Sequence, residues 1–529
     1  MGFDEDAAAD GGAAMSGTDA PRRRRDRTSG RDRSATVPQR PWGQPLMRFE
    51  HPRAVSDDEL DVIHATSLDI LEQVGMEVLD PEARSIYREA GCSVDEATMR
   101  VRFPGDVVER AVATAPSSFV LHSRNPEHHL VIGGRHLAFG TVCSTPNYVT
   151  RAGVRRQGER NGMQDLLKVA QSLNIIHLVS GYPVEPTDIH FSVRHLEASW
   201  DILTLTDKGL PCYSLGRQRN RDCIEMARIA RGVDADTLRR EPSVITIVNT
   251  NSPLRLDTPM SQGMIEFAEQ GQAVVVTPFT LAGAMAPITL AGAVAQQTAE
   301  ALAGIALVQL VNPGAPVVYG GMTSNVDMQS GAPAFGTPEY AKAALVSGQL
   351  ARRYGLPYRS TPPTSANAID GQAVYETMFA LWGIVMGGVN FVMHAAGWME
   401  GGLHASCDKM VLDAEMLQMV AAMLDPLDVS PDALPVDTIA EVGPGGHFFG
   451  TAHTQARFRT EFHRPLLSDW RPYETWAEAG RPTVDQAAHA MVDRLLADYE
   501  PPPMDPEVEA ELRAFVDRRI GEGGVATDY

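Results

Sequence analysis

The feature that most constrains this fold is a regular alternation of short apolar runs and amphipathic segments between residues 137 and 424. Runs rich in β-branched or aromatic residues begin at positions 137, 176, 212, 244, 273, 317, 358 and 390. Segments with the apolar spacing of a helix lie between and after them, at 161–173, 193–206, 222–230, 260–269, 289–311, 338–354, 371–386 and 408–424. Eight strand–helix units in series predict an α/β fold, the (β/α)8 TIM barrel.

A doubly wound sheet would show the same alternation of strands and helices. It would also carry a glycine-rich phosphate loop after one strand, and neither GxGxxG nor a Walker sequence follows any run here. We therefore favour the barrel, over residues 131–425. We expect a mixed, mainly helical extension before it, at 46–130, and a C-terminal loop and helical cap at 426–529.

Two further segments of the N-terminal part have clear signatures. Residues 1–45 hold eight Arg and seven acidic residues among Ala, Gly, Ser and Thr, a composition that predicts a disordered tail. An arm for nucleic acid or a tether for a partner is the alternative. Residues 56–75 predict a helix, with Ser56 and Glu59 as a capping box and Gly75 as its stop.

Composition limits the classes of partner and the compartment. The formal net charge is −21, which argues against a nucleic-acid binder. Five cysteines without any CxxC pair indicate a reducing cytoplasm, and no apolar stretch follows the arginines near the N-terminus as in a signal peptide. Residues 377–399 lack charged side chains, but Gly387 and Gly388 break the stretch. It therefore predicts a buried helix followed by a strand, and no membrane span.

The active site of a barrel is built from the loops after its strands. Aromatic and acidic residues recur in these predicted loops, and several aromatic faces around a pocket favour a quaternary ammonium ion through cation–π attraction. Rings that plug the barrel or pack helices are the alternative. The candidates for substrate binding are Tyr148, Tyr182, Glu185, Phe279, Asp327, Tyr375, Trp398 and Glu400.

Other motifs are fewer. No nucleophile elbow, HExxH or phosphate loop occurs, so we expect no side-chain nucleophile.

His394, His404 and Cys407 suit zinc by type but not by spacing, and we predict no bound metal. In the glycine-rich block at 443–450, His447 and Phe448 are candidates for a loop over the barrel mouth, with a clasp for the last helices as the alternative.

Several long segments resemble the trimethylamine methyltransferase family. They are SLDILEQVGMEVLDPEA (67–83), FPGDVVERAVATAP (103–116), HSRNPEHHL (122–130), DGQAVYE (370–376), NFVMHAAGWMEGGLHASCDKMVLDAEM (390–416) and GPGGHFFGTAHTQARFRTEFHRP (443–465). The resemblance covers residues 50 to 480. It implies a (β/α)8 barrel that transfers a methyl group from an amine to the cobalt of a corrinoid (cobalamin) carried by a separate protein.

The resemblance also bears on the substrate. Founding members of the family carry pyrrolysine near the end of the seventh strand, where this chain has Pro362, Pro363 and Thr364. Relatives without pyrrolysine act on quaternary amines such as glycine betaine, so we expect a betaine-like substrate and, in addition, a homo-oligomer. A binding or regulatory barrel without transfer activity, and a methyltransferase with another acceptor such as tetrahydrofolate, are the alternatives.

Overall fold

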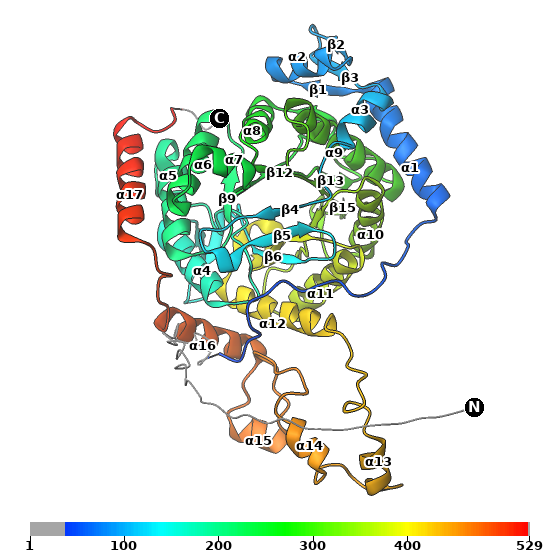
Figure 1. Cartoon of the computed structure of the whole chain (residues 1–529), viewed down its shortest axis with the longest axis vertical. Helices are drawn as coiled ribbons and strands as arrows, with labels where there is room; N and C mark the ends of the chain where they lie inside the picture. Colours follow the sequence, from blue (N-terminus) through cyan, green and yellow to red (C-terminus); the bar gives the residue numbers. More distant parts are fainter. Residues whose placement is uncertain (1–36, 527–529) are drawn as a thin grey trace, which may run out of the picture.

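Seven of the eight predicted apolar runs form one parallel sheet in the computed structural model, which describes residues 37–526 (Figure 1). The order of its strands is β6-β18-β17-β14-β12-β10-β9. Their bounds are β6 (Ala138–Thr141), β9 (Leu210–Tyr213), β10 (Val244–Val248), β12 (Ala273–Val276), β14 (Val317–Gly320), β17 (Tyr358–Ser360) and β18 (Phe391–Ala396).

The remaining run, at 176–181, does not form a regular strand. Leu178 makes isolated parallel bridges to Gly140 of β6 and to Gly209, the residue before β9. Beside it, the His177 ring accepts the backbone N–H of Phe139 at 2.9 Å, so a side chain replaces one bond of the ladder. The sequence pattern detects the apolar run, but it does not show that a side chain takes the place of a backbone hydrogen bond here.

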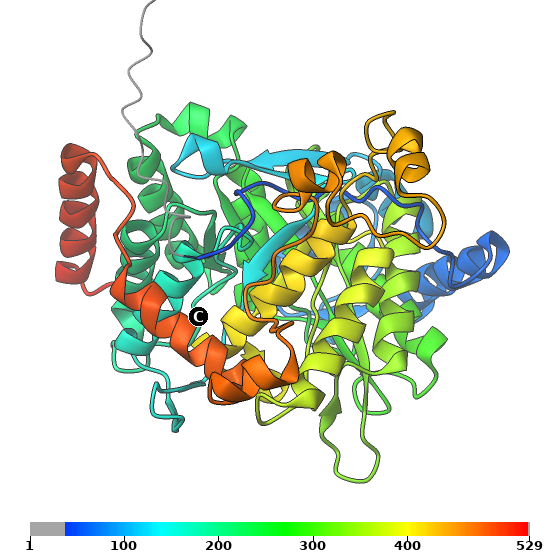
Figure 2. The same ribbon diagram turned by 90° about the horizontal axis from the view of Figure 1, so that it is seen from below.

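All eight helices predicted between the strands are confirmed, and Figures 1 and 2 show them around the sheet. Side-chain caps explain several starts: Thr337 accepts the N–H of Tyr340, and Asp257 accepts that of Met260. A short helix, α7 (Ala235–Arg240), is additional. The eight are α4 (Arg160–Ser172), α5 (Phe191–Leu205), α6 (Arg217–Arg231), α8 (Thr258–Glu269), α9 (Leu290–Val311), α10 (Pro338–Arg353), α11 (Gly371–Met386) and α12 (Cys407–Met423).

Two observations concern segments that could cross a membrane by length and composition. Among residues 37–526, α9 is the one helix long and apolar enough to cross a bilayer, and 89% of its most apolar window is buried in the protein. The uncharged stretch at 377–399 is the predicted helix followed by a strand, because α11 ends at Met386 and β18 begins at Phe391.

The apolar core has an inner and an outer part. The outer part packs the helices on the sheet, whereas the inner part is a separate cluster that includes Ile245, Val275, Val318 and Phe391. The hairpin of β4 (Ser118–Leu121) and β5 (Leu130–Gly133) adds Leu121, Leu130 and Ile132 to the inner cluster. Since Leu121 lies against Gly209, before β9, the hairpin covers the N-terminal ends of the strands.

The N-terminal extension is a small α/β unit. The capping box of Ser56 and Glu59 is present, and the predicted helix continues past α1 (Asp57–Asp69) as a π-helical turn, Ile70–Val74, before Gly75. Its other elements are β1 (Met76–Val78), α2 (Pro81–Glu89), β2 (Ser93–Asp95), β3 (Arg100–Arg102), α3 (Gly105–Val112) and the 3-10 turn Pro126–His128. β11 (Arg255–Leu256) completes its sheet, in the order β11-β1-β3-β2.

The boundary of the predicted tail needs correction. Residues 1–36 lie outside the described part, but residues 37–45 pack against the part of the chain that contains the parallel sheet and its helices. Val37 is 3% exposed, Gln39 donates to the carbonyl of Ser172 at 3.0 Å, and His177 Nε2 lies 3.1 Å from the carbonyl oxygen of Gly43. Composition averaged over 45 residues hides the apolar anchors Val37 and Trp42, which supply the burial that an ordered segment needs.

Short sheets that the sequence did not predict occupy the loops after the strands. One has the order β13-β15-β16, and the other has the order β19-β20-β7-β8. Strands this short give no period that a sequence can show. Their elements are β7 (Asn147–Val149), β8 (Arg155–Gln157), β13 (Phe279–Ala282), β15 (Met322–Val326), β16 (Pro333–Ala334), β19 (Trp398–Met399), β20 (His404–Ala405) and the 3-10 turn Glu400–Gly402.

The C-terminal region has two parts. α16 (Val484–Ala497) packs against α12 and α4, and α17 (Pro506–Gly521) packs against α5 and α6. The preceding segment contains α13 (Val436–Val442), α14 (Ala452–Arg457) and α15 (Tyr473–Glu478), and it extends away from the parallel sheet and its helices in Figure 1.

A pH effect on stability follows from His177. Burial lowers the pKa of His177 to about 3, so the ring stays neutral in the folded protein where the unfolded chain takes up a proton. The free energy of unfolding contributed by this residue therefore falls as the pH drops below about 6.5, by about 1.4 kcal/mol per pH unit down to the folded pKa. In urea titrations at about pH 7, 6 and 5, His177→Gln should show a shallower loss of stability than the wild type.

The matched control for this experiment is His447→Gln, because His447 lies exposed in the C-terminal segment. Its loss of stability with falling pH should equal that of the wild type. An unchanged slope in His177→Gln would contradict the prediction.

Candidate functional site

Several buried polar atoms at the C-terminal ends of the parallel strands have no partner among the described residues. In the described residues they include Ser180 Oγ, Thr277 Oγ1, Thr361 Oγ1, and Nε and Nη1 of Arg359. Ser180 Oγ lies against Gly140 and Thr277 Oγ1 against Gly320, so glycines in the neighbouring strands leave room for them. An unpaired buried polar group costs about 1–3 kcal/mol, so a concentration of such groups indicates a ligand site at this end.

Arg359 is the central residue of this group. Its neighbours Tyr358 and Ser360 bond to α10, at Ala344 and Tyr340, so strand alternation turns Arg359 to the inside of the sheet. It is 2% exposed, and Nη2 donates to the sulfur of Met393. Burial lowers the pKa of Arg359 to about 10, so the group is still charged at neutral pH. No carboxylate of residues 37–526 forms an ion pair with it.

His394 supplies a second free donor in the described part. It lies in β18 with a φ of 55°, inside the irregular stretch between Val392 and Ala396. Nδ1 accepts the N–H of Cys143 at 3.1 Å, so the ring hydrogen is on Nε2, which has no partner among the described residues. Burial, and then the charge of Arg359, lower the pKa of His394 well below its usual value, so the ring is a neutral donor.

An aromatic cluster adjoins His394. The ring centroid of Trp398 lies 4.5 Å from that of His394 and 6.2 Å from that of Phe335, and Phe335 lies 6.3 Å from Phe279. Trp398 Nε1 donates to the carbonyl of Thr364 at 3.1 Å, and a Cβ at Gly402 would lie 2.6 Å from the indole. The structure thus joins the predicted Trp398 and Phe279 through Phe335.

Phe335 is absent from the set predicted from sequence. The signal was available, because Phe335 is the single aromatic residue of the long loop GGMTSNVDMQSGAPAFG after β14.

The segment expected at the pyrrolysine position lies beside this cluster. Pro362, Pro363 and Thr364 are buried directly after β17. Glu376, the last residue of DGQAVYE, accepts the hydroxyl of Thr364 at 2.6 Å and the N–H of Ser365 at 2.8 Å. This carboxylate fixes the loop whose Thr364 carbonyl in turn orients the indole.

Tyr148 and Glu400 lie at the rim of the site, already paired. The Tyr148 hydroxyl donates to Glu159 at 2.5 Å, and burial together with that carboxylate raises the pKa of Tyr148 to about 12. Glu400 binds Arg155 at 2.8 Å and His404 at 2.9 Å. The ion pair with Arg155 balances the charge of Glu400.

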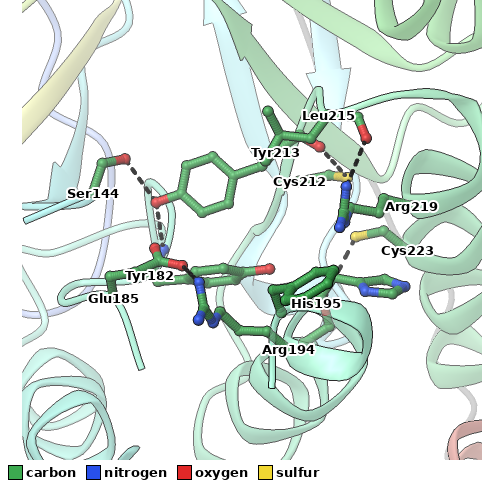
Figure 3. Close-up of a pocket in the computed structure, with 12 residues that line it drawn as sticks. Ser144, Tyr182, Glu185, Arg194, His195, Cys212, Tyr213, Leu215, Arg219 and Cys223 are labelled. Atoms are coloured by element: carbon green, nitrogen blue, oxygen red, sulfur yellow. Dashed lines mark hydrogen bonds and ion pairs between the residues drawn. The ribbon is translucent and has the colours of Figure 1, made fainter. Parts of the chain in front are cut away.

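The two predicted candidates Tyr182 and Glu185 line a separate cavity of about 470 Å³ beside β9, α5 and α6 (Figure 3). The rings of Tyr182 and Tyr213 meet at 4.5 Å and 76°, and the Tyr213 hydroxyl lies 2.7 Å from Ser144 Oγ. Glu185 pairs with Arg194 at 2.9 Å. The other lining residues are Phe191, His195, Ser199, Cys212, Leu215, Arg219 and Cys223.

The structure does not bring four of the predicted residues to the aromatic cluster. Asp327 is exposed on the turn between β15 and β16 and accepts the Ser330 hydroxyl at 2.6 Å, so it caps its own turn. Tyr375 is 62% exposed on α11, and His447 and Phe448 are exposed in the C-terminal segment. A sequence can place a residue in a loop or helix, but the direction of its side chain depends on packing.

The candidate metal ligands also have other partners. His404 bonds to Glu400 and His394 to Cys143. In residues 37–526, no three His, Cys, Asp or Glu side chains are grouped so that they could hold a metal ion.

Comparison with known proteins identifies the class of enzyme to which this chain belongs. The trimethylamine methyltransferase (MTTB) family model matches residues 21–524. The chain is 36% identical to the glycine betaine methyltransferase of Desulfitobacterium hafniense (strain Y51), over 91% of this chain and 99% of that one. It is 32% identical to the trimethylamine methyltransferase MttB of D. hafniense (strain DSM 10664 / DCB-2), over 89% and 95%.

Among solved structures, the monomethylamine methyltransferase of Methanosarcina barkeri aligns with 91% of this chain and 97% of its own, at 10% identity and a TM-score of 0.46. The chain is a methyltransferase. It belongs to the trimethylamine methyltransferase family, as its sequence motifs predicted.

The unpaired guanidinium predicts an effect on stability. Arg359→Met keeps a long side chain against Met393 and removes two orphaned donors. We expect it to raise the free energy of unfolding of the ligand-free protein by about 1–3 kcal/mol, measured by urea titration. Arg353→Met, which removes a surface ion pair with Asp61, is the control and should change it by less than about 0.5 kcal/mol. A loss of stability in Arg359→Met would show that the fold itself pairs this charge.

Proposed function

We propose that this enzyme takes a methyl group from a betaine, a quaternary amine that also carries a carboxylate, and passes it to the Co(I) of a corrinoid bound to a separate protein. Glycine betaine is the simplest such substrate. The observation that carries the proposal is the buried, unpaired guanidinium of Arg359 beside the free donor of His394 and the indole of Trp398.

The carboxylate of the substrate supplies the opposite charge that Arg359 lacks. Arg359 offers unpaired N–H groups on Nε and Nη1, and a charge-assisted hydrogen bond from a guanidinium to a carboxylate is stronger than one between neutral groups. His394 offers its Nε2–H as a further donor. Because this ring is neutral, the positive charge of Arg359 faces the single negative charge of the substrate carboxylate, and the two balance. Trimethylamine has no carboxylate and would leave Arg359 unpaired, so the site favours a betaine.

The ammonium end then lies beside the aromatic cluster. The His394 and Trp398 centroids are 4.5 Å apart, so a short betaine held by His394 places its methyl groups next to the indole and Phe335. A cation over an aromatic face gains about 0.5–2 kcal/mol, depending on how far it is desolvated. Because Glu400 is paired at the rim, aromatic faces rather than a free carboxylate bind the cation.

The reaction needs orientation more than a protein nucleophile. The electron pair of Co(I) forms the bond to the methyl carbon, the C–N bond breaks, and its electrons stay on nitrogen, so a neutral tertiary amine leaves and no proton moves. Burial raises the pKa of Cys143 to about 12, which keeps this nearby thiol protonated. Arg359, His394 and Trp398 hold the substrate so that one methyl group faces the loop side of the sheet.

We further propose that the sheet closes into the eight-stranded barrel expected from sequence. The two bridges of Leu178 support this, because they join β6 and the start of β9, the two edges of the sheet. The extension at 46–130 and the C-terminal region at 426–529 are then additions to a barrel at 131–425. The five buried, unpaired cysteines support a reducing, cytoplasmic location.

The first test combines activity and selectivity. With a corrinoid protein held as Co(I), the wild type should form methylcobalt from glycine betaine faster than from tetramethylammonium, as followed by the visible spectrum. Arg359→Met should weaken glycine betaine binding by about 100-fold or more and leave tetramethylammonium binding unchanged, as measured by calorimetry. No methyl transfer from any betaine, or equal losses for both ligands, would contradict the proposal.

The second test concerns the indole. Trp398→Ala should weaken glycine betaine and tetramethylammonium alike, by about 5- to 30-fold, and Trp398→Phe should recover part of the loss. Tyr375→Phe, on the outer side of α11, is the control and should bind both ligands normally. Unchanged affinities in Trp398→Ala would assign the indole to packing alone.

A further inference from the structure

The C-terminal arm, residues 426–482, is folded but hardly packed against its own chain. α13, α14 and α15 have six or seven residues each, and none of them has a buried residue. Helices this short are not stable alone in water. The arm is held to α12 where the N–H groups of Leu466 and Leu467 donate to Glu415, and Figure 1 shows α13, α14 and α15 below the rest of the molecule.

The surface of the arm is strongly apolar. Of the 23 large apolar side chains exposed in the described residues, eleven lie in the arm, although it is a small part of the chain. Such a concentration marks an interaction surface. The eleven are Leu427, Val429, Leu434, Val436, Ile439, Phe448, Phe449, Phe458, Phe462, Trp470 and Tyr473.

A second uncovered apolar surface lies on α11. Its outward stripe consists of Tyr375, Phe379, Trp382 and Met386, which follow one another at helical spacing. Tyr375 is 62% and Phe379 48% exposed, and the stripe has no charged side chain. The outer helices of a barrel normally present polar residues to water, so this stripe is also unpartnered in the single chain.

We propose that the C-terminal arm of one copy of this protein binds the α11 stripe of a second copy, and the reverse, in a twofold dimer. Both surfaces belong to the same chain, so a reciprocal exchange covers the stripe and part of the arm on both copies and closes the assembly. With a net charge of −21, two copies repel each other over most of their surfaces, and an uncharged stripe is where contact costs least.

The size of the arm surface suits a stable dimer. Six aromatic side chains of the arm are at least 45% exposed. Covering the exposed half of each removes about 450–750 Å² from water. A stable interface buries about 800 Å² on each partner, so the arm supplies most of what one needs.

Sedimentation equilibrium on the full-length protein tests the proposal. The wild type should have the mass of a dimer. The arm variant Phe449→Asp/Phe462→Asp and the stripe variant Phe379→Asp should each raise the dissociation constant by about 30-fold or more. Val62→Asp is the matched control, because Val62 is 66% exposed on α1, away from both surfaces, and should leave the dimer intact. Circular dichroism verifies folding, and Phe379→Ser replaces Phe379→Asp if the latter unfolds.

Mixing the arm variant with the stripe variant tests whether the arm of one copy binds α11 of the other. A mixed dimer of the arm variant and the stripe variant keeps one intact contact, between the arm of the stripe variant and α11 of the arm variant. The mixture should therefore dimerise more strongly than either variant alone. A monomeric wild type, which would mean that another protein covers the arm, overturns the proposal. So does a variant that dimerises normally, or a mixture no stronger than its components.

Discussion

A positive charge held inside the sheet is the constraint on which the rest of the site depends. Arg359 lies above an apolar interior that includes Ile245, Val275 and Phe391, with two guanidinium nitrogens unpaired in the described part of the chain. A buried charge without a partner is costly unless a ligand supplies the opposite charge. The residues around it are arranged accordingly: His394 stays neutral and offers a donor, while Glu376 bonds to Thr364 and Glu400 pairs with Arg155.

Side chains along a strand point alternately to the helices outside and to the site inside, so the same strands support both. Tyr358 and Ser360 bind α10 on the outside of β17, while Arg359 between them points inward. In β18 the irregular backbone at His394 interrupts the alternation, and the chain continues directly into Trp398, whose indole Thr364 orients from the neighbouring loop. Glu376 of α11 holds that loop in turn. A rigid scaffold thereby places Arg359 of β17, His394 of β18 and Trp398 of β19 at the same end of the sheet.

Much of the scaffold was predictable, and less of the site. Helix starts such as Ser56 and Thr337 carry their own signal, because a cap acts within one turn of the chain. The run at 176–181 was predicted as a strand, yet His177 bonds to Phe139 through its ring, a contact between segments that no local pattern encodes. Arg359 was not singled out, since a lone arginine in YRST is typical of an exposed strand end.

The sequence by itself determined the order of strands and helices, the family, and the expectation of an aromatic site at the loop ends, because periodicity, caps and long motifs are local properties of the chain. Only the tertiary structure decided which of the predicted residues meet. Trp398 and Phe279 come together through Phe335, whereas Tyr375 and Asp327 face solvent. The reason is physical: the direction of a side chain and the burial of a charge follow from packing between segments far apart in the chain.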